Sequence, residues 1–353
     1  MAKRKLIGLL AGLFFLSTAP SAWPGQAEEA LNEGLQLHEA GKPKEAIRQY
    51  DRAIRANPKL AEAYYNRGNA HYDLGQNEQA IKDYTEVIRL TPKDAEVYYN
   101  RGNAYRRLKK DDLALKDYTT AIKLNPEDAK SYVNRGSIHF GARRYQSAVE
   151  DHTEAIRLNP KDADHYYNRG NSLLALDKKE QAIEDYNQAI NLDPKLAEAY
   201  YNRGIAYADS GQNEKALEDF TEVLSLNPKS ADAFYNRGLI HAKLGKDDAA
   251  IEDYSEAIRL NPKDPEAPYN RGLAYLRSEK YDYAARDFSE AIRIQPRNAA
   301  VYVQRGMSRL YQGKEKEAEA DFQKAYQIEP ALKKKLRPLI DEAKAKTKQK
   351  AQE

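Results

Sequence analysis

The sequence contains no cysteine among its 353 residues. This absence excludes disulfide bonds, thiolate nucleophiles, cysteine-ligated metals and lipid attachment to an N-terminal cysteine. A long apolar segment is also missing, because the apolar run at residues 6–16 has only eleven residues, whereas a helix needs about 20 to span a bilayer. We therefore expect no stable membrane span.

The chain has little excess charge of either sign. Its formal charge of +3 equals that of Lys3, Arg4 and Lys5, since residues 1–27 contain no acid. Residues 331–353 carry +5, which leaves −5 on the long region between these two ends. A nearly neutral body lacks the dense basic face that binds a duplex, so we expect no nucleic-acid partner.

No constellation of catalytic residues is evident. None of the six histidines has the paired spacing of metal ligands. Gly41-Lys42 lacks the spacing of a phosphate-binding loop. The sequence thus predicts a protein that is not an enzyme, with no cofactor and no metal site.

What the sequence does contain is one 34-residue unit repeated nine times. Counting places so that each repeat ends two residues after a proline, repeat 1 starts at Ala27 and repeat 2 spans 61–94. The closing prolines are Pro58, Pro92, Pro126, Pro160, Pro194, Pro228, Pro262, Pro296 and Pro330. Place 8 is always glycine and place 20 always alanine, as Gly68 and Ala80 illustrate. A fixed period of this length indicates a stacked array.

The apolar pattern of a repeat predicts two helices that face each other. In repeat 2, Tyr64, Gly68 and His71 fall on one face of a first helix, and Ala80 and Tyr84 on one face of a second. A polar turn at residues 75–77 would join the helices, and the proline near the end would stop the second one. A hairpin of this size buries too little apolar surface alone and must stack on its neighbours.

These residues resemble the tetratricopeptide repeat. The order of large aromatic, glycine, aromatic, alanine, aromatic, alanine and proline is the pattern of that family, and the match covers all nine repeats, from Ala27 to about Leu332, although Pro268 replaces the first aromatic in repeat 8. The resemblance implies an all-α fold, an α-solenoid in which antiparallel helix pairs form a right-handed superhelix. It also implies a concave groove that binds other proteins, commonly as extended peptides or helices.

Two charged places depart from the family pattern. Place 7 is arginine and place 23 aspartate in repeats 2 to 9, for example Arg169 and Asp185. Repeat 1 has Glu33 and Gln49 instead, and pairing within each repeat is the arrangement that leaves neither mismatched. We therefore predict a row of arginine–aspartate pairs beside the helix seams. An acidic ligand bound by the arginines is the less favoured alternative.

The surface of the first helix opposite its seam would line the groove. The candidate ligand-binding residues there are place-6 asparagines, place-5 tyrosines and two arginines of repeat 3. They are Asn66, Asn100, Asn134, Asn168, Asn202, Asn236, Asn270, Tyr65, Tyr99, Tyr167, Tyr201, Tyr235, Tyr269, Arg106 and Arg107. Asparagine can both donate to and accept from a peptide backbone. The alternative is that each asparagine ties its own hairpin to the next.

Place 9 changes along the array. It is polar in repeats 2 to 5, from Asn69 to Asn171, and apolar in repeats 6 to 9, from Ile205 to Met307. We expect ligand contacts to become more apolar along the groove. In repeat 8, Pro265 and Pro268 enter the first helix, so we also expect a softer joint between repeats 7 and 8.

The two ends of the chain differ from the array. Residues 1–27 have the basic, apolar and small-residue segments of a signal peptide, with cleavage after Ala22 or Ala27. Residues 28–332 form the array. Residues 333–353 are expected to give a capping helix, kinked or shortened by Pro338, and a basic tail frayed from Ala343 onward.

These observations favour an exported scaffold or assembly factor, periplasmic or secreted, that binds partner peptides. The alternative is an accessory module for glycan binding or for envelope and polysaccharide assembly, in which the tyrosines stack on sugar rings.

Overall fold

The computed structural model describes residues 24–350. The expected signal peptide lies outside the described residues except for its last four, which open helix α1 (Pro24–Glu39). The described chain is made of nineteen α-helices and contains no strand, which confirms the all-α prediction. None of these helices combines the length and the apolar character needed to cross a membrane.

The helices fall into two compact units, one up to Ile138 and one from His139. The N-terminal unit contains α1, α2 (Pro43–Ala56), α3 (Ala61–Asp73), α4 (Asn77–Leu90), α5 (Ala95–Arg107) and α6 (Asp111–Leu124), and α7 (Ala129–Gly141) begins in it. The C-terminal unit contains α8 (Tyr145–Leu158), α9 (Ala163–Ala175), α10 (Lys179–Leu192), α11 (Ala197–Asp209), α12 (Asn213–Leu226), α13 (Ala231–Lys243), α14 (Asp247–Leu260), α15 (Glu266–Arg277), α16 (Tyr281–Ile294), α17 (Ala299–Tyr311), α18 (Glu315–Ile328) and α19 (Leu332–Lys350).

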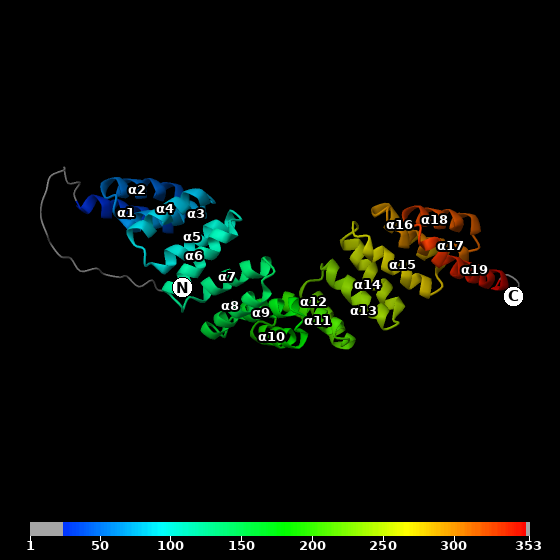
Figure 1. Cartoon of the computed structure of the whole chain (residues 1–353). Coiled ribbons are helices and arrows are strands. Elements are labelled where there is room, and N and C mark those ends of the chain that lie inside the picture. Colours follow the sequence, from blue (N-terminus) through cyan, green and yellow to red (C-terminus); the bar gives the residue numbers. More distant parts are fainter. Residues whose placement is uncertain (1–23, 351–353) are drawn as a thin grey trace. The chain divides into compact units, whose positions relative to one another are not determined.

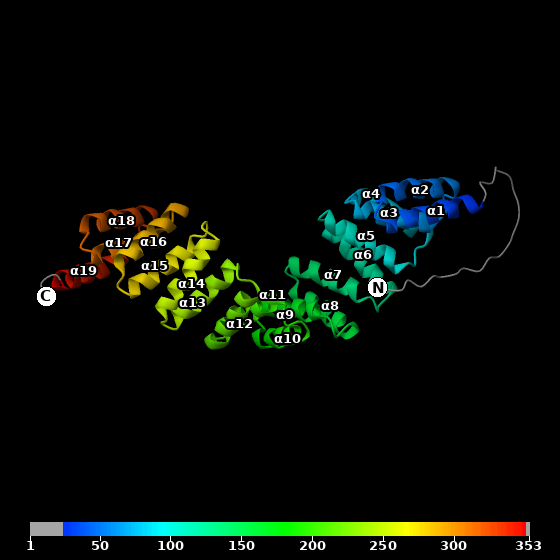
Figure 2. The same ribbon diagram turned by 180° about the vertical axis from the view of Figure 1, so that it is seen from behind.

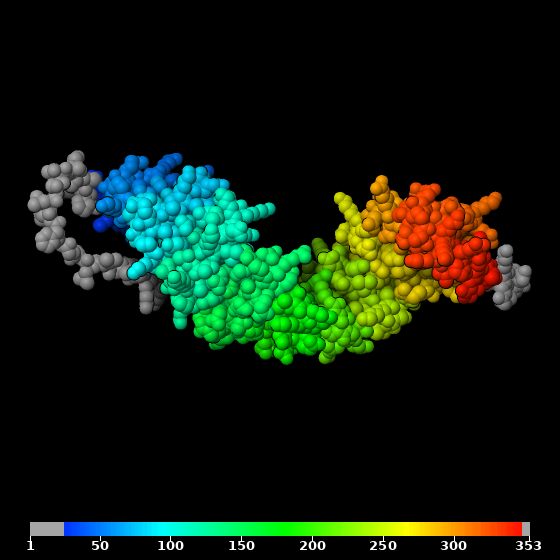
Figure 3. Space-filling model, in the orientation of Figure 1, coloured from blue at the N-terminus to red at the C-terminus, as the bar shows by residue number. Residues whose placement is uncertain are grey.

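Within each unit the helices form antiparallel hairpins stacked in sequence order. Each repeat supplies one hairpin, so that α3 packs on α4 and α4 on α5 (Figure 1). The view from behind shows the same order (Figure 2). In the space-filling view the colours within each unit follow one another along the sequence (Figure 3). Each unit is therefore a segment of an α-solenoid, as predicted.

The closing prolines lie at the corners between successive hairpins, as the sequence predicts. After α2 the backbone of Asn57 is extended, with φ −139° and ψ 93°, and Pro58 follows before α3 begins. Thr91 is likewise non-helical before Pro92. Proline disfavours the helical conformation of the residue before it, and this is why the second helix of each pair ends here.

The turn inside each hairpin requires a left-handed backbone at place 15. Five repeats have glycine there, with φ between 72° and 75°, as at Gly75. The other four have Lys109, Arg143, Asp177 and Glu279, with φ between 55° and 58°. The amide of Gln76 donates to the carbonyl of His71 across this turn at 2.8 Å. Such a turn favours glycine, since a side chain costs about 1–2 kcal/mol in this conformation.

The spacing of glycine and aromatic that recurs in every repeat except repeat 4, which has His152 in place of the aromatic, builds the seam between the two helices. A Cβ added to Gly68 would lie 2.8 Å from Cε1 of Tyr84, and one added to Gly272 would lie 2.7 Å from Cε1 of Phe288. Tyr84 and Phe288 are buried. The close approach predicted from Gly68 and Ala80 is thus confirmed.

The buried face of the first helix differs from the face that the sequence predicts. Places 3 and 10, represented by Ala63 and Ala70, are fully buried, whereas Tyr64 and His71 at places 4 and 11 are half-buried. The first helix packs against the second helices of two hairpins, its own and the preceding one. A helical wheel drawn for one isolated hairpin misses the second of these contacts.

Helix α19 packs on α17 and α18 at the end of the array. Ile340 and Ala343 are buried against Leu310 and Phe322. The helix continues through Pro338 to Lys350, so the expectation of a shortened helix and a tail frayed from Ala343 is wrong. Burial of Ala343 holds the stretch after the proline in place.

Candidate functional site

The predicted arginine–aspartate pairs are present within seven repeats. In each, Nε and Nη2 of the arginine donate to the two carboxylate oxygens of the aspartate at 2.6–3.0 Å. The pairs are Arg67–Asp83, Arg101–Asp117, Arg169–Asp185, Arg203–Asp219, Arg237–Asp253, Arg271–Asp287 and Arg305–Asp321. The eighth arginine, Arg135, belongs to the N-terminal unit and Asp151 to the C-terminal unit.

The third nitrogen of these arginines reaches the preceding hairpin. Nη1 donates to the place-25 side chain of the preceding repeat at 2.5–3.4 Å in all eight cases. The acceptors are Asp51, Thr85, Thr119, Thr153, Asn187, Thr221, Ser255 and Ser289. Sequence reasoning missed this contact, although a run of short polar residues at place 25 was its visible signal.

The arginine guanidinium groups are therefore committed to the fold. Burial by itself would lower the pKa of Arg67, but the hydrogen bonds that Arg67 donates to Asp83 and Asp51 more than offset it, and the pKa lies above its ordinary value. Most of these arginines also lie beside the place-4 ring, as Arg67 does over Tyr64 at 5.5 Å. A group held by three hydrogen bonds is poorly placed to bind an acidic ligand.

Five of the seven predicted groove asparagines tie their hairpin to the preceding one. Their Nδ2 donates to the hydroxyl of the place-5 tyrosine of the preceding repeat at 2.8–3.3 Å. The pairs are Asn100–Tyr65, Asn134–Tyr99, Asn202–Tyr167, Asn236–Tyr201 and Asn270–Tyr235. The alternative role is thus the one these hydrogen bonds show, and ligand binding by this row stays a prediction.

The other two asparagines lack such a partner in the sequence. The repeats before Asn66 and Asn168 have Leu31 and Val133 at place 5, which carry no hydroxyl. Asn66 donates instead to the backbone carbonyl of Glu62 at 2.8 Å. Its side chain is half-buried and remains partly accessible.

The place-5 tyrosines pack against the place-24 rings of their own repeats. The Tyr65 and Tyr84 ring centroids are 6.2 Å apart with the planes tilted by 52°, and Tyr269 packs on Phe288 in the same way. Burial raises the pKa of Tyr65, and the hydrogen bond from its hydroxyl to Glu96 raises it further. The rings of these tyrosines pack within the fold, and most of their hydroxyl groups take part in hydrogen bonds to other residues of the chain.

Arg106 and Arg107 are exposed, but both contact the surface formed by the first helices. Nη1 of Arg106 donates to Oδ1 of Asn134 at 3.2 Å. Arg107 donates to the backbone carbonyl of Tyr72, and its Cζ lies 3.6 Å from the centroid of the Tyr72 ring. Neither of these two arginines is therefore a member of the arginine–aspartate pairs.

The change at place 9 is linked to the seam. In repeats 2, 3 and 5 the place-24 tyrosine donates its hydroxyl to the place-9 asparagine at 2.7–2.8 Å, as Tyr84 does to Asn69. In repeats 6, 8 and 9 place 24 is phenylalanine and place 9 is apolar, as with Phe220 and Ile205. The predicted change from polar to apolar residues at place 9 therefore also follows the identity of the place-24 ring in the same repeat.

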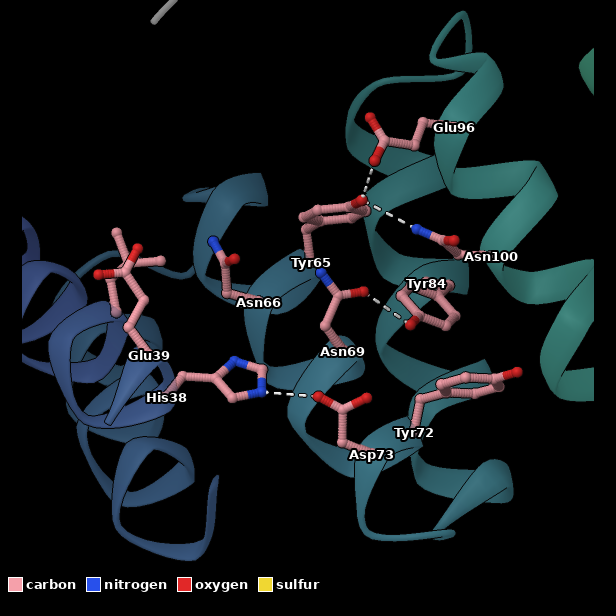
Figure 4. A pocket seen from close by; sticks show the side chains of 11 residues that line it. His38, Glu39, Tyr65, Asn66, Asn69, Tyr72, Asp73, Tyr84, Glu96 and Asn100 are labelled. Atoms are coloured by element: carbon pink, nitrogen blue, oxygen red, sulfur yellow. Dashed lines mark hydrogen bonds and ion pairs between the residues drawn. The ribbon is translucent and has the colours of Figure 1, made fainter. Parts of the chain in front are cut away.

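A pocket of about 430 Å³ opens on the first helices of repeats 1 to 3, within the N-terminal unit. Leu35, His38 and Glu39 come from α1, Tyr65, Asn66, Asn69, Tyr72 and Asp73 from α3, Tyr84 from α4, and Glu96 and Asn100 from α5. Figure 4 shows that the side chains of Asn66 and Asn69 lie between those of Glu39, Asp73 and Glu96. The pocket thus combines predicted residues with carboxylates that sequence reasoning did not single out.

Nε2 of His38 and Oδ2 of Asp73 are 2.8 Å apart, which joins α1 to α3 at one side of the pocket. The Tyr65 hydroxyl donates to Glu96 at 2.6 Å and accepts from Asn100, which joins α3 to α5. Within the described part of the chain no group of three or more histidine, aspartate or glutamate side chains is arranged to hold a metal. The arrangement suits recognition of a polar ligand.

Fold and site together define a helical repeat protein of the class that serves as a scaffold for protein–protein interactions. Sequence profiles of the tetratricopeptide repeat match residues 34–75, 68–109, 95–128, 129–162, 153–184, 170–211, 201–265, 265–298 and 299–332. The chain therefore belongs to the tetratricopeptide repeat family. Repeats of this family are typically non-catalytic and bind other proteins or peptides.

Solved structures with the same fold include two bacterial proteins. One is the C-terminal part of a repeat protein from Cytophaga hutchinsonii, with TM-score 0.60 and 16% identity over 68% of this chain and 98% of that one. Another is a tetratricopeptide repeat protein from Parabacteroides merdae, with TM-score 0.52 and 21% identity over 71% and 99%. YrrB, described as having an unusual peptide-binding site, gives TM-score 0.47 and 26% identity over 56% and 97%. No curated protein sequence gives a significant match.

Proposed function

We propose that the chain binds extended peptide segments of partner proteins on the surface formed by the first helices of its repeats. The observation that carries this proposal is the pocket of repeats 1 to 3, where Asn66 and Asn69 lie between carboxylates. Nδ2 of Asn66 donates to the Glu62 carbonyl, Oδ1 of Asn69 accepts from Tyr84, and the Asn69 amide also interacts with the Tyr65 hydroxyl. The carbonyl oxygen of Asn66 is suited to an N–H group of a peptide backbone.

The packing of the tyrosine row supports a peptide ligand over a glycan. Stacking on a sugar requires an open ring face, whereas Tyr65, Tyr99 and Tyr167 lie tilted against the place-24 rings of their own repeats. The hydroxyls of all three accept from asparagines of the next repeat. The place-5 tyrosines therefore present ring edges and hydroxyl groups to a ligand more than flat ring faces.

The test is binding of the full chain to a random-sequence peptide library and, in parallel, to oligosaccharides, with bound peptides identified by sequencing. Selected peptides should lose about fivefold to tenfold in affinity to the double variant Asn66→Ala/Asn69→Ala, because one or two hydrogen bonds are removed. Asn236→Ala, at place 6 of repeat 7, tests whether the loss is confined to repeats 1 to 3. Binding of oligosaccharides but no peptide would refute the proposal.

We also propose that the protein acts outside the cytoplasm, in a periplasm or after secretion. The support is the order of Lys3-Arg4-Lys5, an eleven-residue apolar run and small residues up to Ala27. Mass spectrometry of the exported protein should find a mature N-terminus after Ala22 or Ala27. The variant Leu9→Asp/Leu10→Asp should stay in the cytoplasm with Met1 or Ala2 at its start. Retention of both forms inside the cell would contradict export.

A further inference from the structure

We propose that the pocket of repeats 1 to 3 binds an arginine side chain of the partner peptide. This inference rests on the proposed peptide-binding function and adds the chemistry that the partner must present at one position. It concerns the N-terminal unit alone, because every residue that lines the pocket lies before Ile138.

The pocket carries an excess of negative charge. Glu39, Asp73 and Glu96 contribute three carboxylates, all from exposed residues, and His38 is the basic residue among those that line it. Figure 4 shows the three carboxylates on different sides of the two central asparagines. A cationic group placed among them would be attracted from several directions at once.

The hydrogen bonds inside the pocket leave mainly acceptors. Asp73 uses Oδ2 for His38 and Glu96 uses Oε1 for the Tyr65 hydroxyl, so the second oxygen of each carboxylate remains for a ligand. Asn66 uses its Nδ2, which leaves its carbonyl oxygen. Asn69 uses its oxygen for Tyr84, and its amide also interacts with the Tyr65 hydroxyl. A ligand that satisfies this set must donate several hydrogen bonds and accept few.

A guanidinium group fits this requirement better than an ammonium group. It presents five N–H donors spread around a plane, whereas lysine presents three donors on one atom. The Tyr72 ring in the pocket lining already contacts the guanidinium of Arg107, itself outside the lining, at 3.6 Å. The ligand's guanidinium would therefore be held by the carboxylates and by the Asn66 carbonyl, and not by the ring face that Arg107 covers.

The corresponding surface of the C-terminal unit lacks this combination. A pocket of about 200 Å³ there is lined by residues of repeats 5 to 7, including Glu198, Asn202 and Asp232. Place 13, which supplies Glu39 and Asp73 in repeats 1 and 2, is Ala175 in repeat 5, and the place-13 Asp209 does not line the pocket. The arginine pocket is therefore a local feature of repeats 1 to 3, even though the repeats share one pattern.

The experiment measures binding of the full chain by isothermal titration calorimetry. The probes are peptides selected from the random library and, for each, versions in which a single arginine is replaced by citrulline, by lysine or by glutamate. Citrulline keeps the shape of arginine and removes its charge. We expect citrulline to weaken binding by about tenfold, lysine by less, and glutamate by the most.

The protein variants are Glu39→Gln and Asp73→Asn, with Asp209→Asn as the matched control at place 13 of repeat 6. The first two should each lower the affinity for the arginine peptide several-fold and leave the citrulline peptide nearly unchanged, and the control should change neither. Because Asp73 also contacts His38, Glu39→Gln serves as the second variant if Asp73→Asn loosens the joint. Circular dichroism verifies that each variant is folded.

The outcomes separate the two proposals. Selected peptides that bind equally well with arginine or citrulline, and equally well to Glu39→Gln, would overturn the arginine pocket and leave the peptide-binding function intact. Failure of every library peptide to bind would overturn the peptide-binding function and the arginine pocket with it. Selective loss with citrulline and with Glu39→Gln would support both.

Discussion

Repeat 2 of the N-terminal unit and repeat 6 of the C-terminal unit close the same helix seam in two ways. In repeat 2 the ring of Tyr84 packs on Gly68 and its hydroxyl donates to Asn69 at 2.8 Å. In repeat 6 the ring of Phe220 packs in the corresponding place, and Ile205 packs against its cluster where repeat 2 has the asparagine. The ring position is fixed by the glycine, and the residue at place 9 follows the chemistry of the ring.

The residue at place 9 answers a requirement of the fold, and its identity is not by itself evidence of a ligand. A buried hydroxyl has to form a hydrogen bond, whereas a phenylalanine ring needs only an apolar neighbour. The pairing is a tendency, because Tyr254 in repeat 7 has Leu239 at place 9. A difference at place 9 between the two units can therefore be caused by the place-24 ring in the helix seam, and not by a ligand.

The largest expected effect concerns the arginine–aspartate pairs in the two units. Asp185→Ala should destabilise the array by about 2 kcal/mol, because the partly buried Arg169 would keep one side-chain hydrogen bond, to Thr153 at 3.4 Å. Asp83→Ala should lower the free energy of unfolding by less, since Arg67 keeps its hydrogen bond to Asp51 at 2.6 Å. Urea unfolding measures both, with the exposed Asp209→Ala as control.

A double-mutant cycle of Arg169→Ala and Asp185→Ala tests the pair itself. The two effects should be clearly less than additive, because either change alone leaves a charge without its partner. Additive effects would argue against the pairing.

The next effect concerns His152, which holds place 24 in repeat 4 and is buried in the C-terminal unit. Burial lowers its pKa to about 4, against 6.5 for an ordinary histidine, so protonation favours the unfolded chain. The stability that neutral His152 provides should be present above about pH 6.5 and be lost as the pH falls toward 4. From pH 7 to pH 5 the wild type should lose about 1–2 kcal/mol more than His152→Phe.

Unfolding curves of both proteins at the two pH values give this difference, because all other titrating groups are shared. Phenylalanine is the matched substitution, since it holds the same place in repeats 6, 8 and 9. Equal pH dependence of wild type and variant would show that His152 does not titrate in this way.

Exchanging the two seams should have a smaller effect. Phe220→Tyr should destabilise the C-terminal unit by about 1 kcal/mol, because its hydroxyl would face Ile205. Adding Ile205→Asn should recover most of that loss. Thermal unfolding followed by circular dichroism compares the single and double variants. A double variant less stable than either single variant would break the proposed link between places 9 and 24.

The smallest expected effect is a gain in stability at the inner turns. Lys109→Gly should stabilise the N-terminal unit by about 0.5–1 kcal/mol, because its φ of 56° is strained for a residue with a side chain. Gly245→Ala should destabilise the C-terminal unit by a similar amount. Chemical denaturation measures both changes, and stabilisation by the alanine would contradict the explanation.

The periodic part of the structure could be predicted from the sequence. Helix pairs, closing prolines and the Gly68–Tyr84 seam follow from spacings that every repeat shares, and the pairing of Arg169 with Asp185 followed from the mismatch in repeat 1. These predictions succeeded because each contact lies within one repeat, where sequence separation fixes spatial separation.

Contacts between repeats were harder to predict. The hydrogen bond from Arg169 to Thr153 and the bond from Asn100 to Tyr65 join successive hairpins, and their geometry depends on how those hairpins stack. The same reason explains why the carboxylates Glu39, Asp73 and Glu96 were not recognised as one site. They come from three repeats and meet only after stacking.

The two kinds of tie between neighbouring hairpins have a mechanical consequence. Where a joint has both, the arginine holds the place-25 side chain of the preceding repeat and the asparagine holds its place-5 tyrosine, so such a joint is fastened at two separate points. Swinging one hairpin about either point strains the other. Under a pulling force these joints should resist gradual bending and then give way a whole repeat at a time, so that the protein lengthens in steps.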